Sequence, residues 1–301
     1  MDLERLRNLA TEFKVAFDAE LAGDTSGEFK LPSRDAVALI CRRYLDILFP
    51  VFFLGQRLDR ESLPSDSRRY FREIETLLAE QMCRAICFDL RRRDQPPPGN
   101  MTDCVGKQLD ALFSQLPELS ALLASDIEAA FHNDPAAPSH EEILLSYPCI
   151  EAITVQRLAH RLYLLDVPFI PRMMTEVVHS RTGIDIHPGA SIGESFFIDH
   201  GTGVVIGETC RIGKRVRIYQ GVTLGAKSFP LDAEGNPIKG IDRHPIVEDD
   251  VIIYSGATIL GRVTIGAGSV VGGNVWITWD VPAGSVIHQT TASPKSTGEN
   301  R

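Results

Sequence analysis

Two short runs of the sequence gather side chains that can do chemistry, and they read Asp199-His200-Gly201-Thr202-Gly203 and Asp242-Arg243-His244-Pro245. A neutral imidazole can take the proton from a hydroxyl group while its oxygen attacks a carbonyl carbon. A guanidinium presents a planar fork that matches a carboxylate. A lone histidine is more often structural than catalytic, so the elements that would position these runs must be identified first.

The second half of the chain repeats every six residues. The aliphatic positions of this repeat are Ile186, Ile192, Ile198 and Val204, then Ile212, Ile218 and Leu224, then Val247, Ile253, Ile259, Ile265, Val271 and Ile277. Neither a helical period nor the two-residue alternation of a strand gives this spacing. A parallel β-helix does, because each short strand stacks one aliphatic residue inward and the chain bends at a small residue.

Two interruptions of the repeat predict loops. Two extra residues fall between Val204 and Ile212, and a longer insertion, residues 226–245, carries Lys227, Lys239, Arg243 and His244. Insertions in a solenoid leave it as loops, often on the functional face. We therefore expect residues 226–245 to project from the solenoid close to the chemistry.

The first part of the chain has helical spacing, shown by Leu6, Leu9, Phe13 and Phe17 and by Leu109, Leu112, Leu116 and Leu119. Consecutive prolines in residues 94–100 must interrupt these helices. The sequence predicts an N-terminal all-α domain, residues 1–183 with a loop near 94–100. A left-handed parallel β-helix of hexapeptide repeats, residues 184–289, follows it, and residues 290–301 form a flexible tail.

Composition and charge exclude several classes of protein. The chain of 301 residues carries a formal charge of −9 without a basic stripe, which argues against a nucleic-acid partner. No apolar run approaches the ~20 residues that span a bilayer, and the first residues do not read as a signal peptide, so we expect no membrane contact and a cytoplasmic location. The six scattered cysteines indicate reduced thiols, and the pair Cys83 and Cys87 lacks the second pair of a metal site, so no metal is expected.

Further runs narrow the function. They are Thr182-Gly183-Ile184-Asp185-Ile186-His187-Pro188, Gly203-Val204-Val205-Ile206-Gly207-Glu208-Thr209, Gly221-Val222-Thr223-Leu224-Gly225 and, in the helical part, Asp134-Pro135-Ala136. Together with the two runs above they resemble the serine acetyltransferase family, in the family's order, over about half the chain. The resemblance implies an acyltransferase that moves an acetyl group from acetyl-CoA to the hydroxyl of L-serine. The products would be O-acetyl-L-serine and CoA, in the first step of cysteine biosynthesis.

The resemblance also implies roles for individual residues. His200 would be the general base and Asp185 the carboxylate that orients its imidazole, in a His-Asp dyad that lets serine attack the thioester directly. The implied substrate-binding residues are Asp134 and Asp199 for the ammonium group, Arg243 for the carboxylate and His244 beside it. Three hexapeptides complete a coil, so the position stacked above Asp185 is near residue 203, three residues from His200. The dyad is therefore expected to meet across a corner.

The acetyl-CoA contacts are expected along the insertion and the coil above it. The implied residues are Gly225 and Ala226 through their backbone amides, Ser255 and Gly256 lining a groove, and Lys227 and Lys239 near the phosphates. Ala226 stands where the family commonly has glycine, and the insertion is longer than in the shorter family pattern.

Three other functions fit parts of the sequence. A hexapeptide-repeat O-acetyltransferase with a different acceptor, such as a sugar, would also use one histidine. A zinc hydratase of the γ-carbonic-anhydrase type needs three imidazoles, and His187, His200 and His244 do not resemble its pattern. A scaffold protein without activity would need none of the polar candidates.

The resemblance further implies an assembly and a regulator. Family members form homotrimers or dimers of trimers, with the active site between neighbouring solenoids. L-cysteine is expected to inhibit by occupying the serine site. Many members bind the next enzyme of cysteine synthesis through a C-terminal isoleucine, whereas this sequence ends in Arg301, so we expect that cysteine synthase complex to be weak or absent.

Overall fold

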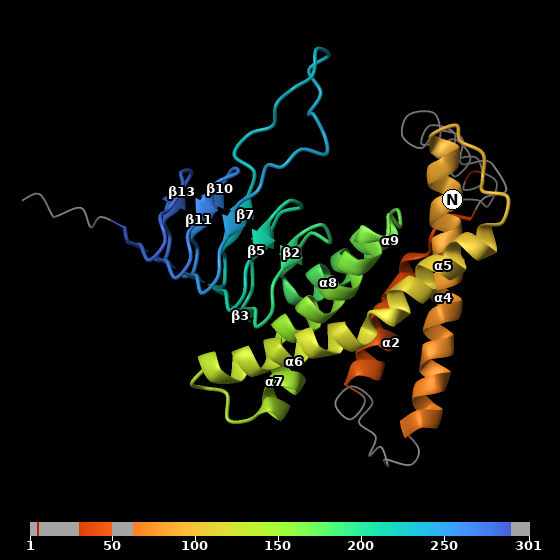
Figure 1. Cartoon of the computed structure of the whole chain (residues 1–301), viewed down its shortest axis with the longest axis horizontal. Helices are drawn as coiled ribbons and strands as arrows, with labels where there is room; N and C mark the ends of the chain where they lie inside the picture. Colours follow the sequence, from red (N-terminus) through yellow and green to blue (C-terminus); the bar gives the residue numbers. More distant parts are fainter. Residues whose placement is uncertain (1–4, 6–29, 50–62, 290–301) are drawn as a thin grey trace, which may run out of the picture.

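The computed structural model describes residue 5, residues 30–49 and residues 63–289 (Figure 1). The helices of these residues come first in the chain: α2 (Arg34–Leu48), α4 (Leu63–Arg92), α5 (Met101–Ser114), α6 (Leu116–Asn133), α7 (His140–Ser146), α8 (Pro148–Leu164) and α9 (Ile170–Thr182). Residues 93–100 link α4 to α5, and the side chain of Asn100 caps α5. The stripe from Leu6 to Phe17 and the tail from residue 290 lie outside the described residues.

Short parallel strands then wind into a solenoid of three sheets. Sheet A contains β1 (Asp185–Ile186), β4 (Val205–Ile206), β7 (Thr223–Gly225), β10 (Thr258–Leu260) and β13 (Trp276–Ile277). Sheet B contains β2 (Ser191–Ile192), β5 (Arg211–Ile212), β8 (Ile246–Val247) and β11 (Thr264–Ile265). Sheet C contains β3 (Phe197–Asp199), β6 (Arg217–Tyr219), β9 (Ile252–Ile253), β12 (Val270–Val271) and β14 (Val286–Ile287). The predicted left-handed parallel β-helix is confirmed.

The register corrects one sequence prediction. Ile186 pairs with Ile206, which pairs with Leu224, so the first coil is two residues longer than the next. The extra residues therefore lie between Ile198 and Ile206, not between Val204 and Ile212 as the sequence analysis placed them. Val204 fits the six-residue spacing because it is apolar and stands six residues after Ile198. It is also fully buried, but it lies at the corner before β4 and not in the strand.

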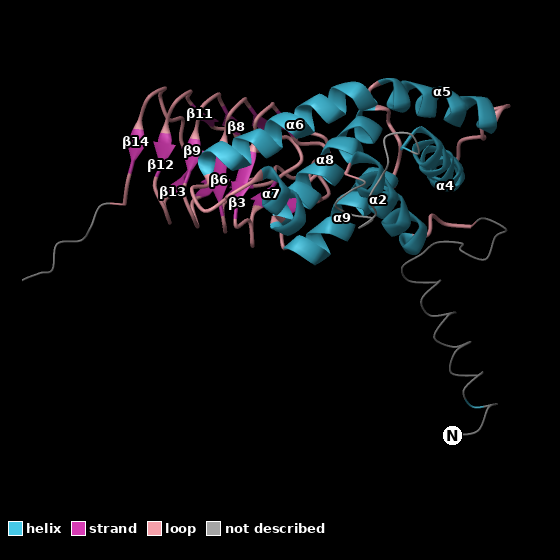
Figure 2. Cartoon of the chain, turned by 90° about the horizontal axis from the view of Figure 1, so that it is seen from below, coloured by secondary structure: helices cyan, strands magenta, loops and turns pink. Residues whose placement is uncertain are grey.

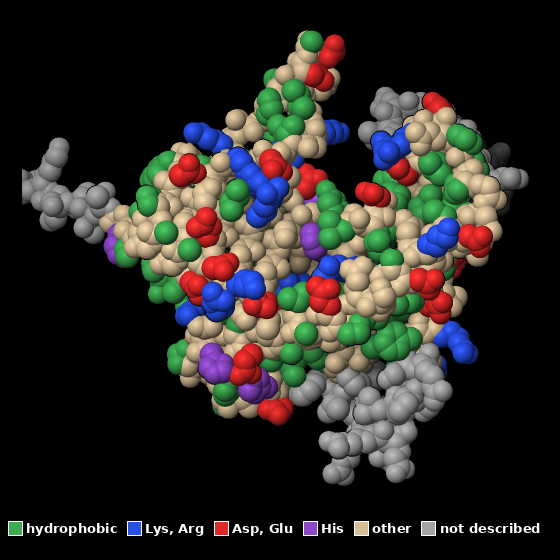
Figure 3. Space-filling model, viewed as in Figure 1, with side chains coloured by type: hydrophobic (Ala, Val, Ile, Leu, Met, Phe, Trp, Pro, Cys, Tyr) green, Lys and Arg blue, Asp and Glu red, His purple; other side chains and the backbone are tan. Residues whose placement is uncertain are grey.

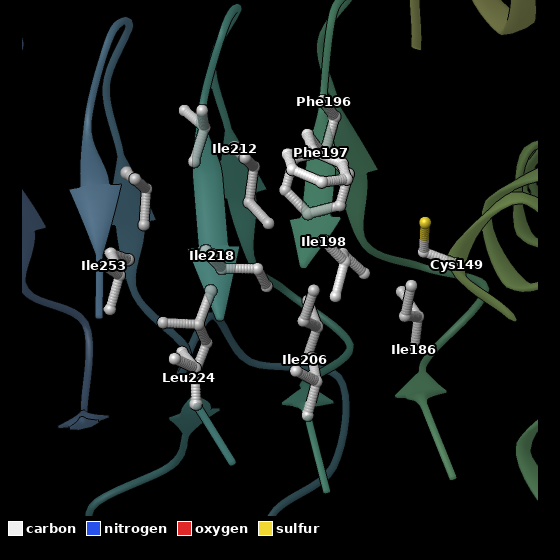
Figure 4. Close-up of a cluster of buried hydrophobic side chains, with 14 of the residues drawn as sticks. Cys149, Ile186, Phe196, Phe197, Ile198, Ile206, Ile212, Ile218, Leu224 and Ile253 are labelled. Carbon is white, nitrogen blue, oxygen red and sulfur yellow. The ribbon is translucent and has the colours of Figure 1, made fainter. Parts of the chain in front are cut away.

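The interior of the solenoid is a set of stacked aliphatic ladders. Ile186, Ile206 and Leu224 form one ladder and Ile198, Ile218 and Ile253 another, and Figure 4 shows them side by side. Burying such a side chain contributes roughly 1.5–3 kcal/mol. The same apolar core continues into α6 and α8, where Cys149 lies at the end of the ladders. A second core joins α2, α4, α5, α8 and α9.

The helices also cover the open end of the solenoid (Figure 2). The first coil has no preceding coil to satisfy its backbone groups, and unpaired buried groups are costly. Arg157 of α8 donates to the carbonyls of Ile192 at 3.0 Å and Gly193 at 2.7 Å. Asp126 of α6 pairs with the Arg157 guanidinium and also accepts from the Phe196 amide at 2.9 Å. Helical part and solenoid are therefore joined by a buried polar contact.

Residues 226–245 leave the solenoid as a long arm between β7 and β8 (Figure 1). An antiparallel bridge joins Leu231 to Pro237, and the amide of Asp232 donates to the carbonyl of Asn236. Figure 3 shows hydrophobic side chains along the arm. The exposed large apolar residues there are Phe229, Leu231 and Ile238.

The cysteines and the helices can be compared with the predictions made from composition. All six cysteines lie among the described residues and are free, as predicted. None of the helices described here is both long and apolar enough to cross a membrane.

Candidate active site

The two edges of sheet A carry the candidate residues. Each coil enters sheet A through a corner from sheet C, here called the C–A edge, and leaves it through a corner to sheet B, here called the A–B edge. The C–A edge comprises residues 183–184, 200–204, 220–222 and 255–257. The A–B edge comprises residues 187–190, 207–210, 225–245 and 261–263.

His200 occupies the lengthened corner of the C–A edge. Its φ of 58° is left-handed, a conformation that costs a residue with a Cβ roughly 1–2 kcal/mol. The next residue, Gly201, has φ 83°, and a Cβ there would come within 2.5 Å of Ile184. At this corner the His200 side chain points away from the interior of the solenoid, and it is 71% exposed.

A cavity of 470 Å³ lies beside His200. It is lined by Asp134, Ala136, Ser146, Tyr147, Pro148, Cys149, Ile198, Asp199, His200 and Thr202. The structure thus brings three of the predicted residues together: Asp134 from the end of α6, Asp199 from β3, and His200.

The Asp134 carboxylate has two partners in this cavity. One oxygen accepts from the Ala136 amide at 2.8 Å, which is the turn-capping role that aspartate often has. The other accepts from the hydroxyl of Tyr147, a residue that the sequence analysis missed. Burial, and then the hydrogen bond to Asp134, raise the pKa of Tyr147, so its hydroxyl stays protonated and donates.

The Asp185 carboxylate lies on the outer face of β1, whose backbone pairs with Val205 and not with residue 203. Asp185 forms an ion pair with Arg172, with 3.9 Å between Nη1 of the arginine and Oδ1 of the aspartate. The carboxylate close to the His200 imidazole is that of Asp199, with 3.7 Å between Nε2 and Oδ1. Within the described part of one chain, no hydrogen bond or ion pair joins Asp185 to His200, so the dyad stays a prediction.

Arg243 and His244 lie on the opposite edge, at the root of the arm. Arg243 pairs with Glu208, with 2.6 Å between Nη2 and Oε2. The backbone amides of Arg243 and His244 both donate to the hydroxyl of Thr209, at 2.9 and 3.1 Å. Glu208 and Thr209 belong to a run that carried the family resemblance, yet the sequence analysis gave them no role.

The His244 ring is buried against the backbone of Gly207, where a Cβ would lie 2.0 Å from the ring. Its Nδ1 atom accepts from the Thr209 amide at 3.1 Å. Burial, and then the positive charge of Arg243, lower the pKa of His244 to about 4. A neutral imidazole therefore faces the site at physiological pH.

The acetyl-CoA candidates are divided in the same way. Ser255 and Gly256 belong to the C–A edge, where Gly203, Gly221 and Gly256 stack on one another with left-handed backbones. These glycines leave a strip of backbone without side chains, which is exposed at Gly203 and half-buried at Gly221 and Gly256. Gly225, Ala226 and Lys227 belong to the A–B edge, and Lys227 packs beside Gly261. Lys239 lies on the arm, which is exposed there.

The two edges of one chain are separate. Residues 203–208 run through β4 from one edge to the other, and at ~3.3 Å per residue they span roughly 15 Å. His187 and His244 lie on the A–B edge and His200 on the C–A edge, so the three histidines of a zinc hydratase do not meet within one chain. Among the described residues, one group has the spacing of a metal site, and it consists of Glu176, His179 and Asp185.

Comparison with known proteins first defines the class. Residues 244–278 match the family model described as bacterial transferase hexapeptide (six repeats). The solenoid therefore carries the hexapeptide repeat of bacterial transferases.

Relatives then define the family. The plasmid serine acetyltransferase of Synechococcus elongatus is 52% identical over 263 residues, which cover 87% of this chain and 82% of that relative. The serine acetyltransferase of Bacillus subtilis is 46% identical over 166 residues, covering 55% of this chain and 72% of that relative. The chain belongs to the serine acetyltransferase family, and the predicted resemblance is confirmed. Members of this family are acyltransferases, and acetyl transfer implies acetyl-CoA as co-substrate.

Solved structures agree with this assignment. Serine acetyltransferase 1 of Entamoeba histolytica, in complex with L-cysteine, superposes with a TM-score of 0.72 at 35% identity, covering 87% of this chain and 88% of that one. Soybean serine acetyltransferase, complexed with serine, superposes with a TM-score of 0.55 at 27% identity, covering 87% of this chain and 99% of that one.

Proposed function

We propose that this chain is a serine O-acetyltransferase that transfers acetyl from acetyl-CoA to the hydroxyl of L-serine, in the first step of cysteine biosynthesis. The observation that carries the proposal is the 52% identity to a serine acetyltransferase over 87% of this chain. The relatives with serine and with L-cysteine in their structures support an amino-acid ligand.

In the proposed mechanism, the His200 imidazole takes the proton from the serine hydroxyl while its oxygen attacks the thioester carbonyl. Such general-base catalysis contributes roughly a hundred- to ten-thousand-fold. Asp185 orients the imidazole and stabilises its protonated form. Backbone amides near Gly225 and Ala226 stabilise the developing oxyanion. The C–S bond then breaks, and the CoA sulfur takes the proton from the imidazolium.

The amino acid would be held by charges from both edges. Asp134 and Asp199 suit its ammonium group, and Arg243 with His244 suits its carboxylate. Because roughly 15 Å separates these edges in one chain, a single site requires the C–A edge of one copy and the A–B edge of the next. A ring closed by one repeated contact provides this arrangement. We therefore propose a homotrimer, which the helices pair into a dimer of trimers.

L-cysteine differs from serine in one atom and is proposed as a feedback inhibitor at the same site. Its inhibition would be competitive with serine.

The reaction is tested by following thiol release from acetyl-CoA with L-serine as acceptor. We expect release that depends on serine and saturates with it. Release with a sugar and none with serine would reject the proposed acceptor, and no release with any acceptor would favour the scaffold reading.

The shared site is tested by mixing two inactive variants, His200→Ala and Arg243→Ala, under conditions that exchange subunits. A site between chains pairs intact halves at about a quarter of random interfaces, so activity should return to about that fraction. No recovery, with subunit exchange verified by two affinity tags, would place each site within one chain.

A further inference from the structure

We infer that Glu208 is a positioning residue that holds the substrate-binding guanidinium of Arg243, and that Tyr163 of the helical part holds Glu208. This inference rests on the proposed function, since it concerns the carboxylate subsite of the amino acid. The contact between Tyr163 of α8 and Glu208 of the A–B edge would thus help to orient the substrate-binding arginine.

The contacts form a chain of three side chains. The hydroxyl of Tyr163, near the end of α8, donates to Oε1 of Glu208 at 3.1 Å. The other oxygen, Oε2, accepts from Nη2 of Arg243 at 2.6 Å. The Arg243 and Glu208 side chains are 22% and 24% exposed, so solvent screens this ion pair less than it screens a surface pair.

This arrangement leaves the guanidinium able to bind a ligand. A guanidinium has five N–H groups in a rigid fork. Glu208 takes one, and the Ile241 carbonyl accepts from Nη1 at 3.3 Å. Further N–H groups remain for the carboxylate of an amino acid. Glu208 thus fixes the direction of the fork without occupying it.

The local charges keep Glu208 ionised. Burial alone would raise its pKa, but the hydrogen bond and the positive charge of Arg243, together with the hydrogen bond from Tyr163, lower it overall. The two nearby imidazoles, His187 and His244, have pKa values lowered to about 4, mainly by burial, and so do not compete as cations at neutral pH. Arg243 is therefore the cation that Glu208 holds.

The pair is also accessible to a small ligand. Glu208 and Arg243 line a cavity of 300 Å³, and the rest of its wall comes from the arm, namely Phe229, Pro237, Ile238, Lys239 and Gly240. The apolar part of this wall reduces the access of water to the ion pair. A second ion pair of the solenoid, Arg215 with Asp250, is exposed and lies at a corner between sheets B and C. It serves as a matched control.

The test compares three variants with the parent enzyme at the same oligomeric state: Glu208→Ala, Tyr163→Phe and the control Asp250→Asn. For Glu208→Ala we expect the KM for serine and the Ki for L-cysteine to rise about tenfold, the scale of one charge-assisted hydrogen bond. The kcat and the KM for acetyl-CoA should change less than about threefold, because a lost binding contact acts on KM alone. Tyr163→Phe should raise the serine KM roughly two- to threefold, and Asp250→Asn should not change it.

A double-mutant cycle separates positioning from general stability. If Glu208 acts through Arg243, then Glu208→Ala should add little to the serine KM in an Arg243→Lys background. Additive effects, or an unchanged serine KM in Glu208→Ala, would overturn the inference while the proposed function stands. If the parent itself shows no turnover with serine, the proposed function fails instead. Calorimetric binding of L-cysteine to parent and Glu208→Ala then still tests the positioning.

Discussion

The two edges of sheet A come from the same repeat, but their candidate side chains are held in place to different degrees. On the C–A edge, His200 stands on a left-handed backbone with its side chain largely exposed. On the A–B edge, Arg243 and His244 are fixed by Glu208, Thr209 and the root of the arm. The A–B edge is thus assembled within one chain, whereas the C–A edge leaves its central side chain with room to meet a substrate. We expect the two to respond differently to mutation.

The largest effect should come from the C–A edge. His200→Ala removes the proposed base, so kcat/KM for serine should fall at least about a hundredfold with little change in stability. The exposed His132→Ala, at the end of α6, is the matched control and should keep full activity. A loss of less than tenfold in His200→Ala would shift the base to another residue.

The next effect concerns the buried contact that joins the helices to the first coil of the solenoid, outside both edges. Arg157→Met leaves the Asp126 carboxylate buried without its partner, which should cost about 3–5 kcal/mol in the free energy of unfolding. Denaturant unfolding measures this. Combining it with Asp126→Leu removes the unpaired charge but leaves the carbonyls of Ile192 and Gly193 and the amide of Phe196 without these partners, so only part of the loss should be recovered. Arg215→Gln, at an exposed pair, should cost less than about 1 kcal/mol. Equal losses at both arginines would remove the distinction.

A pH titration sharpens the contrast by testing the burial of the A–B edge. The folded-state pKa of His244 is lowered to about 4, below the unfolded value of about 6.5. The unfolded state therefore binds the proton first as pH falls, and stability is lost between about pH 6.5 and 4. Protonation would also remove the acceptor that the Thr209 amide uses. Between about pH 7.5 and pH 4 the parent should therefore lose about 3 kcal/mol more of its free energy of unfolding than His244→Asn loses. Equal losses in the parent and in His244→Asn would contradict the burial of this imidazole.

The smallest effect should come from the polar support of the C–A edge. Tyr147→Phe removes the hydroxyl that donates to Asp134, and the serine KM should rise roughly three- to fivefold. Tyr70→Phe, on α4, removes a surface hydroxyl and should change nothing. A fall in kcat without a change in KM would instead place Tyr147 in the chemical step.

Much of the fold follows from local spacing. A six-residue aliphatic period has one physical solution, since each strand must bury one side chain and turn at the next corner. The family resemblance was also available, because its residues occur in short runs. The register of the first coil could not be predicted from the sequence, because Val204 and Ile206 are both apolar and both buried. Only the pairing between coils distinguishes them.

The sequence by itself therefore determined the solenoid, the helical part and the set of candidate residues. Only the tertiary structure decided how these residues are grouped. It divided them between two edges, joined Tyr163 to Glu208 across 45 residues of chain, and buried Arg157 with Asp126 from another helix. The physical reason is that a repeat fixes the distance between neighbouring coils, whereas contacts between distant segments depend on how whole elements pack.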